Sequence, residues 1–322
     1  MKRSRFLTTV GAVATAIAIP LPSLASDSDI TLTTATGNIY GTLTMPNTTA
    51  PVSVALIIAG SGPTDRSGNN PGLPGKNDAY QLLAAALYAK GIASVRYDKR
   101  GVGASAAAIK SEHALHFDDY VADAAAWIAM LRSDKRFKNI VVAGHSEGAL
   151  IGTIAAQQAQ GTSLVTLEGA GRPAPVVLRE QLQKNLPPDQ YAQSDAILAQ
   201  LQAGKTVPIP STASQTIKAL FRESVQPYLI SWFKYDPAVE IGKVQSAINV
   251  VQGTADVQVT MVDATDLAKG NPHARLVVVD GMNHVLKHAP DTSTQAAIVA
   301  GYTDPLLPVE PKVVDTIANA VS

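Results

Sequence analysis

Short apolar runs alternate with segments of helical periodicity along most of this chain. Near the start, residues 30–35 and 39–45 alternate apolar and polar positions, which predicts an antiparallel hairpin turned at Gly37-Asn38. Later runs are continuously apolar and rich in β-branched residues, as buried strands are. Such strands are predicted at 52–59, 92–97, 140–143, 164–167, 247–251 and 275–279.

Helices are predicted between these strands. Their apolar residues recur every three or four positions, and several end at glycine or basic residues. The predicted ranges are 78–90, 117–131, 149–160, 261–269 and 311–321. Strands that alternate with helices indicate an α/β fold, in which helices cover both faces of a mainly parallel sheet. The hairpin is then an antiparallel addition at one edge.

Residues 171–243 interrupt this alternation. The segment is rich in Gln, Leu and Pro, and its spacing is helical at 176–186, 189–201, 215–221 and 225–233. We interpret it as a helical cap over the carboxyl ends of the strands, where α/β sheets bind their ligands. Its aromatic residues are the candidates for substrate contact, although packing within the cap explains them equally well: Tyr228, Trp232 and Phe233.

The first 25 residues predict a secretory signal peptide. Three basic residues precede the apolar run 6–19, two prolines follow it, and Ser23 and Ala25 are the small residues that signal peptidase requires. A membrane anchor is the alternative, but the run is shorter than the ~20 residues of a spanning helix. We therefore expect cleavage after Ala25, a mature hydrolase domain over 26–322, and a periplasmic or secreted protein without a stable membrane anchor.

Composition narrows the possible partners. The chain has 322 residues, of which 46% are hydrophobic and 16% charged, as in globular proteins. Its formal net charge is zero, so nothing suggests a nucleic-acid partner. Without cysteine there are no disulfides. No metal-ligand spacing or cofactor motif is found, and oligomeric state is left open.

The most informative motif is Gly144-His145-Ser146-Glu147-Gly148. It lies between the apolar strand 140–143 and an Ala-rich helix. This is the context of a strained strand-to-helix turn that exposes a nucleophilic serine above the sheet. The glycines are needed because side chains at 144 and 148 would collide with neighbouring backbone. The variable position, His145, is expected to point away from the nucleophile.

A nucleophilic serine needs a histidine base. Among the six histidines, His284 follows strand 275–279 at a carboxyl end, and Gly281 lets that loop turn. His288, four residues later, is the rival. A chain order of serine, acid, histidine is typical of such hydrolases and favours His284 over His288.

The histidine in turn needs an orienting carboxylate. Asp256 follows strand 247–251 and lies between Ser146 and His284 in the sequence. Glu168, just after strand 164–167, is the rival. Asp280 is too close to His284 along the chain to reach it easily. We favour Asp256.

The negative charge of a tetrahedral intermediate requires backbone N–H donors. Glu147 directly follows the nucleophile at a helix N-terminus, where the helix dipole favours an anion. The loop Gly60-Ser61-Gly62-Pro63 is suited to supply the second donor, and we assign it to the Ser61 amide. A phosphate-binding loop is the alternative for this segment, but it lacks the Lys-Ser/Thr ending.

Together these residues resemble the α/β-hydrolase superfamily, and within it the secreted bacterial esterases often grouped with serine aminopeptidase-like hydrolases. The segments that carry the resemblance are 60–66, 98–105, 144–148, 253–256 and 283–284. The chain departs from the family at Ala59, where many members have histidine. The resemblance implies a carboxylesterase that acts on short or medium acyl esters without a cofactor. A peptidase or amidase with the same triad, and a non-enzymatic binding protein on this fold, are the alternatives.

Overall fold

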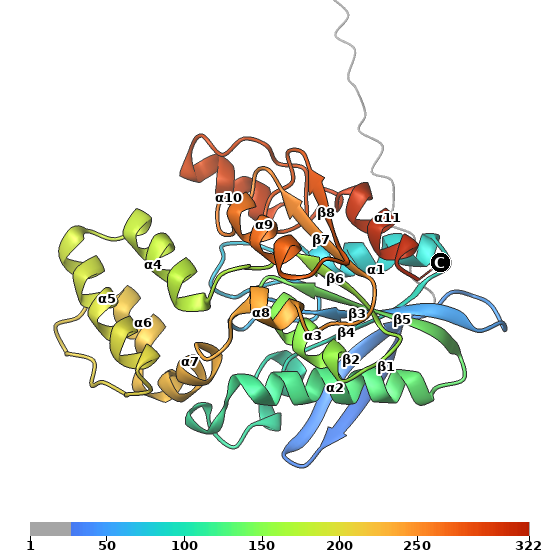
Figure 1. The fold of residues 1–322 in the computed structure, drawn as a ribbon, viewed down its shortest axis with the longest axis horizontal. Helices are drawn as coiled ribbons and strands as arrows, with labels where there is room; N and C mark the ends of the chain where they lie inside the picture. The colour runs from blue at the N-terminus through green and yellow to red at the C-terminus, as the bar shows by residue number, and fades with distance from the viewer. Residues whose placement is uncertain (1–26, 322) are drawn as a thin grey trace, which may run out of the picture.

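A computed structural model describes residues 27–321, so the predicted signal peptide lies outside the described part. Its centre is one eight-stranded sheet in the order β1-β2-β4-β3-β5-β6-β7-β8, in which β1, β2 and β4 pair antiparallel and all other neighbours pair parallel (Figure 1). The strands are β1 (Asp27–Thr34), β2 (Gly37–Thr44), β3 (Val52–Ile58), β4 (Ala93–Tyr97), β5 (Phe137–His145), β6 (Ser163–Leu167), β7 (Ile248–Gly253) and β8 (Ala274–Val279).

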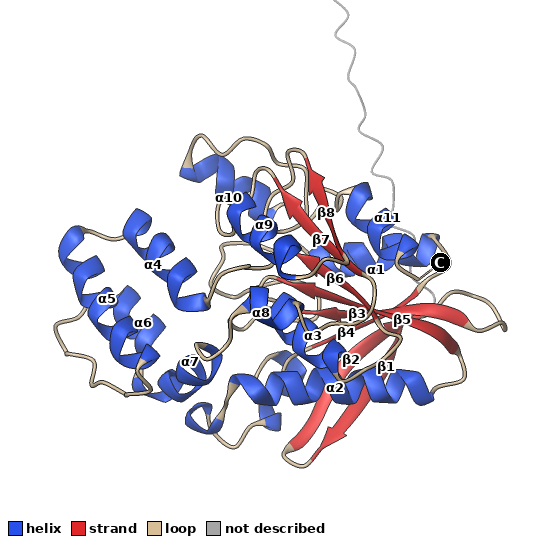
Figure 2. Cartoon of the chain, in the orientation of Figure 1, coloured by secondary structure: helices blue, strands red, loops and turns tan. Residues whose placement is uncertain are grey.

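Helices cover both faces of this sheet (Figure 2). Alternate residues of β3 show why its sequence is continuously apolar. Leu56 and Ile58 join one hydrophobic cluster, whereas Ala55 and Ile57 join the other, so neither face of the strand meets water. One cluster contains α1 (Ala79–Ala89) and α11 (Pro311–Asn319), and the other contains α2 (Phe117–Ser133), α3 (Glu147–Gln157) and α9 (Met261–Gly270).

Between β6 and β7 the chain leaves the sheet and forms five helices. Four of them lie to one side of the sheet in Figure 1, and α8 packs against α3 and α9. The five are α4 (Ala174–Asn185), α5 (Pro188–Gln202), α6 (Gln215–Phe221), α7 (Gln226–Trp232) and α8 (Pro237–Ile241). Short 3-10 turns occur at Gly103–Ala108, Glu112–Ala114 and Glu223–Val225.

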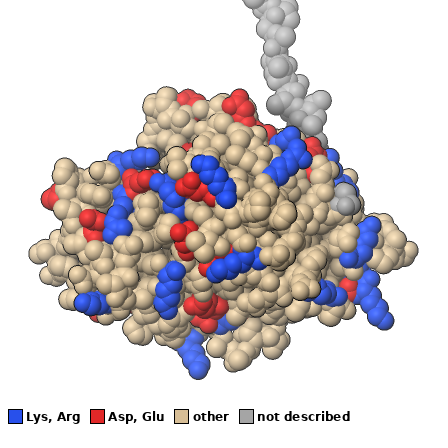
Figure 3. All heavy atoms as spheres, viewed as in Figure 1, with Lys and Arg blue, Asp and Glu red and all other residues tan. Residues whose placement is uncertain are grey.

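Two helices have no counterpart in the sequence-based prediction. The helix α10 (Gln295–Thr303) consists mainly of small and apolar residues with little amphipathic contrast, so periodicity does not reveal it. The short α8 begins with Asp236 capping the N–H of Ala238 and Val239. None of the described helices combines the length and the apolar character needed to cross a bilayer. Basic and acidic side chains are intermingled on the face shown in Figure 3.

Candidate active site

Ser146 lies on the sharp turn that joins β5 to α3. Its backbone has φ 55° and ψ −120°, a conformation that side chains rarely adopt. The flanking glycines make this turn possible. A Cβ atom at Gly144 would lie 2.2 Å from the carbonyl oxygen of Gly148, and one at Gly148 would lie 2.4 Å from that of Ile58. The turn therefore holds the serine partly exposed at the carboxyl edge of the sheet.

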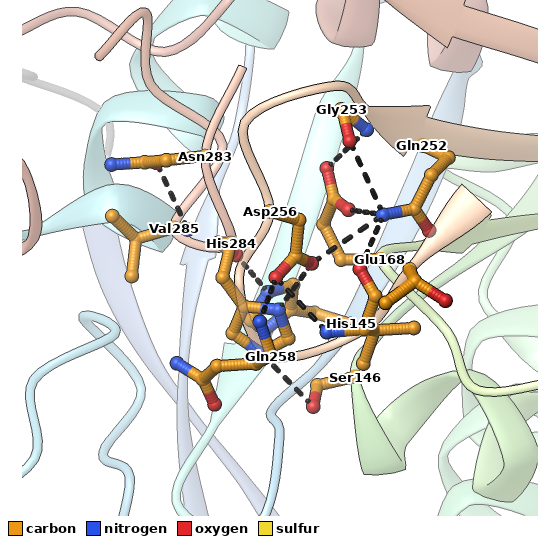
Figure 4. Close-up of polar contacts among 12 residues, drawn as sticks. His145, Ser146, Glu168, Gln252, Gly253, Asp256, Gln258, Asn283, His284 and Val285 are labelled. Carbon is orange, nitrogen blue, oxygen red and sulfur yellow. Dashed lines mark hydrogen bonds and ion pairs between the residues drawn. The ribbon is translucent and has the colours of Figure 1, made fainter. Parts of the chain in front are cut away.

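Three loops bring a serine, a histidine and a carboxylate together at this edge (Figure 4). The Oγ atom of Ser146 lies 3.2 Å from Nε2 of His284. The Nδ1 atom of the same ring lies 2.7 Å from Oδ2 of Asp256. This is the geometry of a base that accepts the serine proton while the carboxylate fixes its tautomer.

The loop after β7 holds the Asp256 carboxylate rigidly. Its Oδ1 atom accepts hydrogen bonds from the N–H groups of Gln258 at 2.7 Å and Val259 at 3.0 Å. The side chain is fully buried. Burial acts to raise the pKa of Asp256, but the facing His284 and the hydrogen bonds outweigh it and hold the pKa below its usual value. Asp256 is thus an anion beside His284.

Glu168, the rival carboxylate, lies on the far side of Asp256 (Figure 4). It is completely buried, its Oε1 accepts from the N–H of Gly253 at 2.8 Å, and its Oε2 accepts from the side chain of Gln252. Burial, followed by the negative charge of Asp256, raises the pKa of Glu168 well above its usual value. The raised pKa favours the neutral form of Glu168 behind the Asp256 anion.

Oxygen and nitrogen atoms of Glu168, Asp256 and His284 lie within 4.8 Å of one another, close enough in principle to surround a cation. The contacts given above already use these atoms. Nδ1 of His284 faces Asp256, and both Glu168 oxygens accept hydrogen bonds from the protein. The arrangement therefore suits a hydrogen-bonded cluster within the protein better than a metal.

The rival histidine lies elsewhere. The His288 side chain is 63% exposed, and its Nδ1 atom pairs with Glu310 at 2.8 Å. It makes no contact with Ser146 among the interactions of the described residues. His288 thus belongs to the surface of the loop that carries His284.

His145 has a closer relation to the site than its place in the motif suggests. Its imidazole makes no hydrogen bond to Ser146, but its Nε2 atom lies 2.6 Å from the main-chain carbonyl oxygen of His284, and its Nδ1 atom lies 2.7 Å from the hydroxyl of Tyr80. The Tyr80 oxygen accepts the N–H of Gly60 at 3.1 Å. Burial, with the nearby His284, lowers the pKa of His145 to about 3. This neutral ring, through Tyr80, links the loop of Gly60 and Ser61 to the loop that carries His284.

The two candidate oxyanion donors flank the serine. Glu147 is the first residue of α3, so its N–H has no partner within the helix. Gly60, which precedes Ser61, approaches the nucleophile so closely that a Cβ atom there would lie 3.1 Å from Cβ of Ser146. The oxyanion loop is also tied to the next loop, because Arg66 pairs with Asp98 at 2.9 Å.

A buried ion pair lies beneath these donors. The Nζ atom of Lys99 is 2.8 Å from Oε2 of Glu147 and 2.6 Å from the carbonyl oxygen of Gly60. The side chains of Lys99 and Glu147 are 1% and 2% exposed. The Tyr228 hydroxyl donates to the other oxygen of Glu147, and the ammonium lies 4.7 Å from the ring centroid of Tyr120. Sequence reasoning gave Lys99 no role, because a lysine in a loop is usually solvated.

Three cavities share the candidate donor Ser61, and two of them also include Ser146. The first, about 120 Å³, includes Ser146 and His284 together with polar side chains such as Asn70, and we call it the His284 cavity. The second, about 90 Å³, also includes Ser146, together with Leu150 and Leu178; we call it the Leu150 cavity.

The third cavity lies between the sheet and the cap and has a volume of about 460 Å³; we call it the cap cavity. It touches both candidate donors, Ser61 and Glu147, and shares Leu178 and Trp232 with the Leu150 cavity. Of the three cap aromatics, Tyr228 and Trp232 line it. Phe233 lines none of the three cavities and packs on Trp232 at a centroid distance of 6.2 Å.

Comparison with known proteins identifies the family of this chain. A family model described as serine aminopeptidase, S33 matches residues 70–321, well over half of the chain. The chain belongs to this family. It is 24% identical over 316 residues to Esterase EstD of Thermotoga maritima, covering 92% of this chain and 68% of the relative.

Solved structures show the same fold. Est1E of Butyrivibrio proteoclasticus with bound ferulic acid has a TM-score of 0.55 and 17% identity, covering 81% of this chain and 93% of that one. The Pyrococcus furiosus esterase Pf2001 has a TM-score of 0.54 and 14% identity, covering 80% and 83%. The chain therefore has the α/β-hydrolase fold, and it is an enzyme of this hydrolase family.

Proposed function

We propose that the protein is a serine carboxylesterase that cleaves esters of short to medium acyl chains through an acyl-enzyme on Ser146. The observation that carries the proposal is the continuous hydrogen-bonded line from Ser146 through His284 to the buried Asp256. Esterases among the relatives and structural neighbours support the same activity.

The mechanism follows from the donor and acceptor positions. Nε2 of His284 removes the proton of the Ser146 hydroxyl as its oxygen attacks the ester carbonyl. The amides of Ser61 and Glu147 bind the resulting oxyanion. When the tetrahedral intermediate collapses, the C–O bond to the alcohol breaks, and His284 gives its proton to the leaving oxygen. Water, deprotonated by His284, then releases the carboxylic acid and restores Ser146.

The same chemistry orients the substrate. His284 must reach the leaving oxygen, so the alcohol belongs in the His284 cavity, which this side chain lines. All three cavities include Ser61, but only the Leu150 and cap cavities include Glu147 and exclude His284, so they suit the acyl group. Their volumes sum to the range of small-molecule sites, roughly 300–1,000 Å³. An apolar chain fits their leucine and aromatic walls.

Amide hydrolysis by the same triad is the alternative reaction. An aminopeptidase needs an unpaired carboxylate to hold the α-amine of its substrate. The acidic side chains that line the three cavities are Glu112 and Glu147, and both are ion-paired, with Arg222 and Lys99 respectively. The cavities therefore favour an uncharged acyl group.

The test compares the wild-type chain on p-nitrophenyl esters of two to twelve carbons and on aminoacyl-anilides. We expect kcat/KM for the preferred ester to exceed that for every anilide by at least about a hundredfold. Faster anilide cleavage would assign the triad to peptides instead.

We also propose that residues 1–25 direct export and that the mature enzyme works in the periplasm or medium. The apolar run behind three basic residues supports this. Expressing the full chain in a Gram-negative host and sequencing the N-terminus of the exported protein checks it. A product that keeps Met1 in the cytoplasm would contradict it.

A further inference from the structure

The carbonyl group of Gly60 marks a link between the buried ion pair and the candidate oxyanion site. Lys99 binds this carbonyl at 2.6 Å and Glu147 at 2.8 Å. One ammonium thus holds both segments that carry the candidate donors, the loop of Ser61 and the first turn of α3. The nucleophile lies between them.

Peptide geometry gives this contact a direction. The described chain contains no cis peptide bond, so the Gly60–Ser61 peptide is trans. In a trans peptide the C=O and N–H point in opposite directions across one plane. Fixing the Gly60 oxygen on the Lys99 side therefore fixes the Ser61 N–H on the opposite side. The N–H of Gly60, held by Tyr80, constrains the preceding peptide as well.

Electrostatics adds a second effect. A positive charge on the carbonyl oxygen polarises the peptide and makes its N–H a stronger donor, because linked hydrogen bonds reinforce one another. The carboxylate of Glu147 alone would repel an oxyanion formed at its own backbone amide. Lys99 compensates this charge through one carboxylate oxygen, and the hydroxyl of Tyr228 donates a hydrogen bond to the other.

We propose that Lys99 is a positioning residue of the oxyanion hole: its ammonium orients and polarises the Gly60–Ser61 peptide, and Glu147 holds that ammonium in place. The inference rests on the proposed function, since it assumes that Ser61 and Glu147 bind the oxyanion. It predicts a loss of transition-state binding, with little change in substrate binding, when the ammonium is removed.

The experiment uses Lys99→Met, Glu147→Gln and the double variant Lys99→Met/Glu147→Gln. Each is assayed for kcat and KM on a p-nitrophenyl ester and for the Ki of an alkyl boronic acid that forms a tetrahedral adduct. We expect Lys99→Met to lower kcat roughly 10- to 100-fold, below or near the cost of losing one oxyanion donor. KM should change less than about threefold, and the boronate Ki should rise in step with the loss in kcat/KM.

The double variant separates the two effects. If Lys99 only neutralised Glu147, removing both charges would restore wild-type kcat, and that result would overturn the proposal. We expect kcat of the double variant to stay at least tenfold low, because nothing then polarises the Gly60 carbonyl. A Lys99→Met enzyme within twofold of wild type would overturn it too. Lys99→Met leaves the buried Glu147 carboxylate unpaired and could fail to fold for that reason. The double variant has no such charge, so its kcat tests the proposal in that case.

Arg96→Met is the matched control. Arg96 is a buried cation three residues away on β4, paired with Asp27 at 2.9 Å; among the described contacts it makes no hydrogen bond to Gly60, Ser61 or Glu147. Its loss should lower the thermal midpoint but leave kcat per folded molecule unchanged. The rate of labelling by a fluorophosphonate needs no ester substrate. If the wild type labels at Ser146 but cleaves no ester, the proposed function fails, while the labelling rate of Lys99→Met still decides this inference.

Discussion

The Nε2 atom of His145 lies 2.6 Å from the main-chain carbonyl oxygen of His284, so the residue before Ser146 holds the backbone of His284. With its pKa lowered to about 3 by burial, His145 is neutral and can donate only one N–H, which the His284 carbonyl accepts. Nδ1 must then accept the proton of the Tyr80 hydroxyl, 2.7 Å away. The tautomer of His145 is fixed by these two partners.

Tyr80→Phe tests this chain of contacts. The substitution removes the hydroxyl that binds both His145 and the N–H of Gly60, and leaves the ring in the core. We expect kcat to fall about tenfold, because the loops of Gly60 and His284 are then no longer linked through Tyr80 and His145. The free energy of unfolding should fall by about 1–2 kcal/mol. Steady-state kinetics and thermal unfolding measure the two effects. Tyr88→Phe, on the same helix but outside the three cavities, is the control; an equal loss there would refute a specific role.

Ser146→Ala should remove nearly all turnover and keep the fold. In hydrolases with such a triad, losing the nucleophile costs on the order of 10⁶ in kcat. The alanine variant should also lose reaction with a fluorophosphonate, whose adduct on the wild type maps by mass spectrometry to Ser146. An adduct on any other serine, or an active variant, would show that the nucleophile is elsewhere.

The two carboxylates should respond differently to neutral isosteres. Asp256→Asn removes the charge that stabilises the imidazolium of His284 and should cost about 10⁴ in kcat. Glu168→Gln replaces a group whose raised pKa favours its neutral form and should cost less than about tenfold. For the bases, His284→Ala should abolish activity, whereas His288→Ala removes only an exposed pair with Glu310. A larger loss from Glu168→Gln than from Asp256→Asn would transfer the acid role to β6.

The raised pKa of Glu168 also predicts how stability depends on pH. Above the ordinary carboxyl pKa of about 4.3, the unfolded chain releases this proton while the folded chain keeps it. The folded state therefore binds more protons, and this group's contribution to stability is lost as pH rises through its folded pKa. Glu168→Gln takes no part in this titration. Its unfolding free energy relative to wild type should thus increase between pH 5 and pH 9 in urea titrations; a constant difference would mean that Glu168 is ionised in the fold.

The sequence predicted the parts of this molecule that follow local rules. Buried strands show in β-branched runs, and the glycines of the serine turn are required by backbone contacts between adjacent elements. The positions of Ser146, Asp256 and His284 just after predicted strands then predicted that all three lie at the same edge of the sheet. Which of two neighbouring carboxylates, Asp256 or Glu168, pairs with His284 depends on their burial and on the distances to His284. A single sequence gives neither.

Other features depend on contacts between distant segments. Tyr80 belongs to the apolar stripe of a helix, and nothing in that stripe reveals that its hydroxyl meets His145, 65 positions away. In the sequence Lys99 looks like an ordinary solvated lysine of a loop. Only the fold shows that its ammonium binds Glu147 and the carbonyl of Gly60. Such pairs satisfy buried polar groups across the fold, so their signal lies in three-dimensional packing rather than in periodicity or spacing.

Trp232 should set acyl-chain preference without taking part in the chemistry. It lines both the Leu150 cavity and the cap cavity, and its ring stacks on Phe117 with centroids 6.1 Å apart. In such a pocket each methylene contributes about 1–3 kcal/mol to transition-state binding. Trp232→Ala should therefore shift kcat/KM between neighbouring chain lengths by about tenfold or more, while an acetate ester is still cleaved.

Phe233→Ala is the matched control for this prediction, because Phe233 packs on Trp232 but lines none of the three cavities. It removes a neighbouring aromatic ring from the same segment and should lower kcat/KM for all esters by a similar factor. The comparison uses kcat/KM for p-nitrophenyl esters from acetate to dodecanoate with both variants. If Trp232→Ala also scales every chain length down uniformly, the tryptophan only stabilises the cap. If Phe233→Ala alone changes the preference, the acyl chain follows a path on the other side of α7.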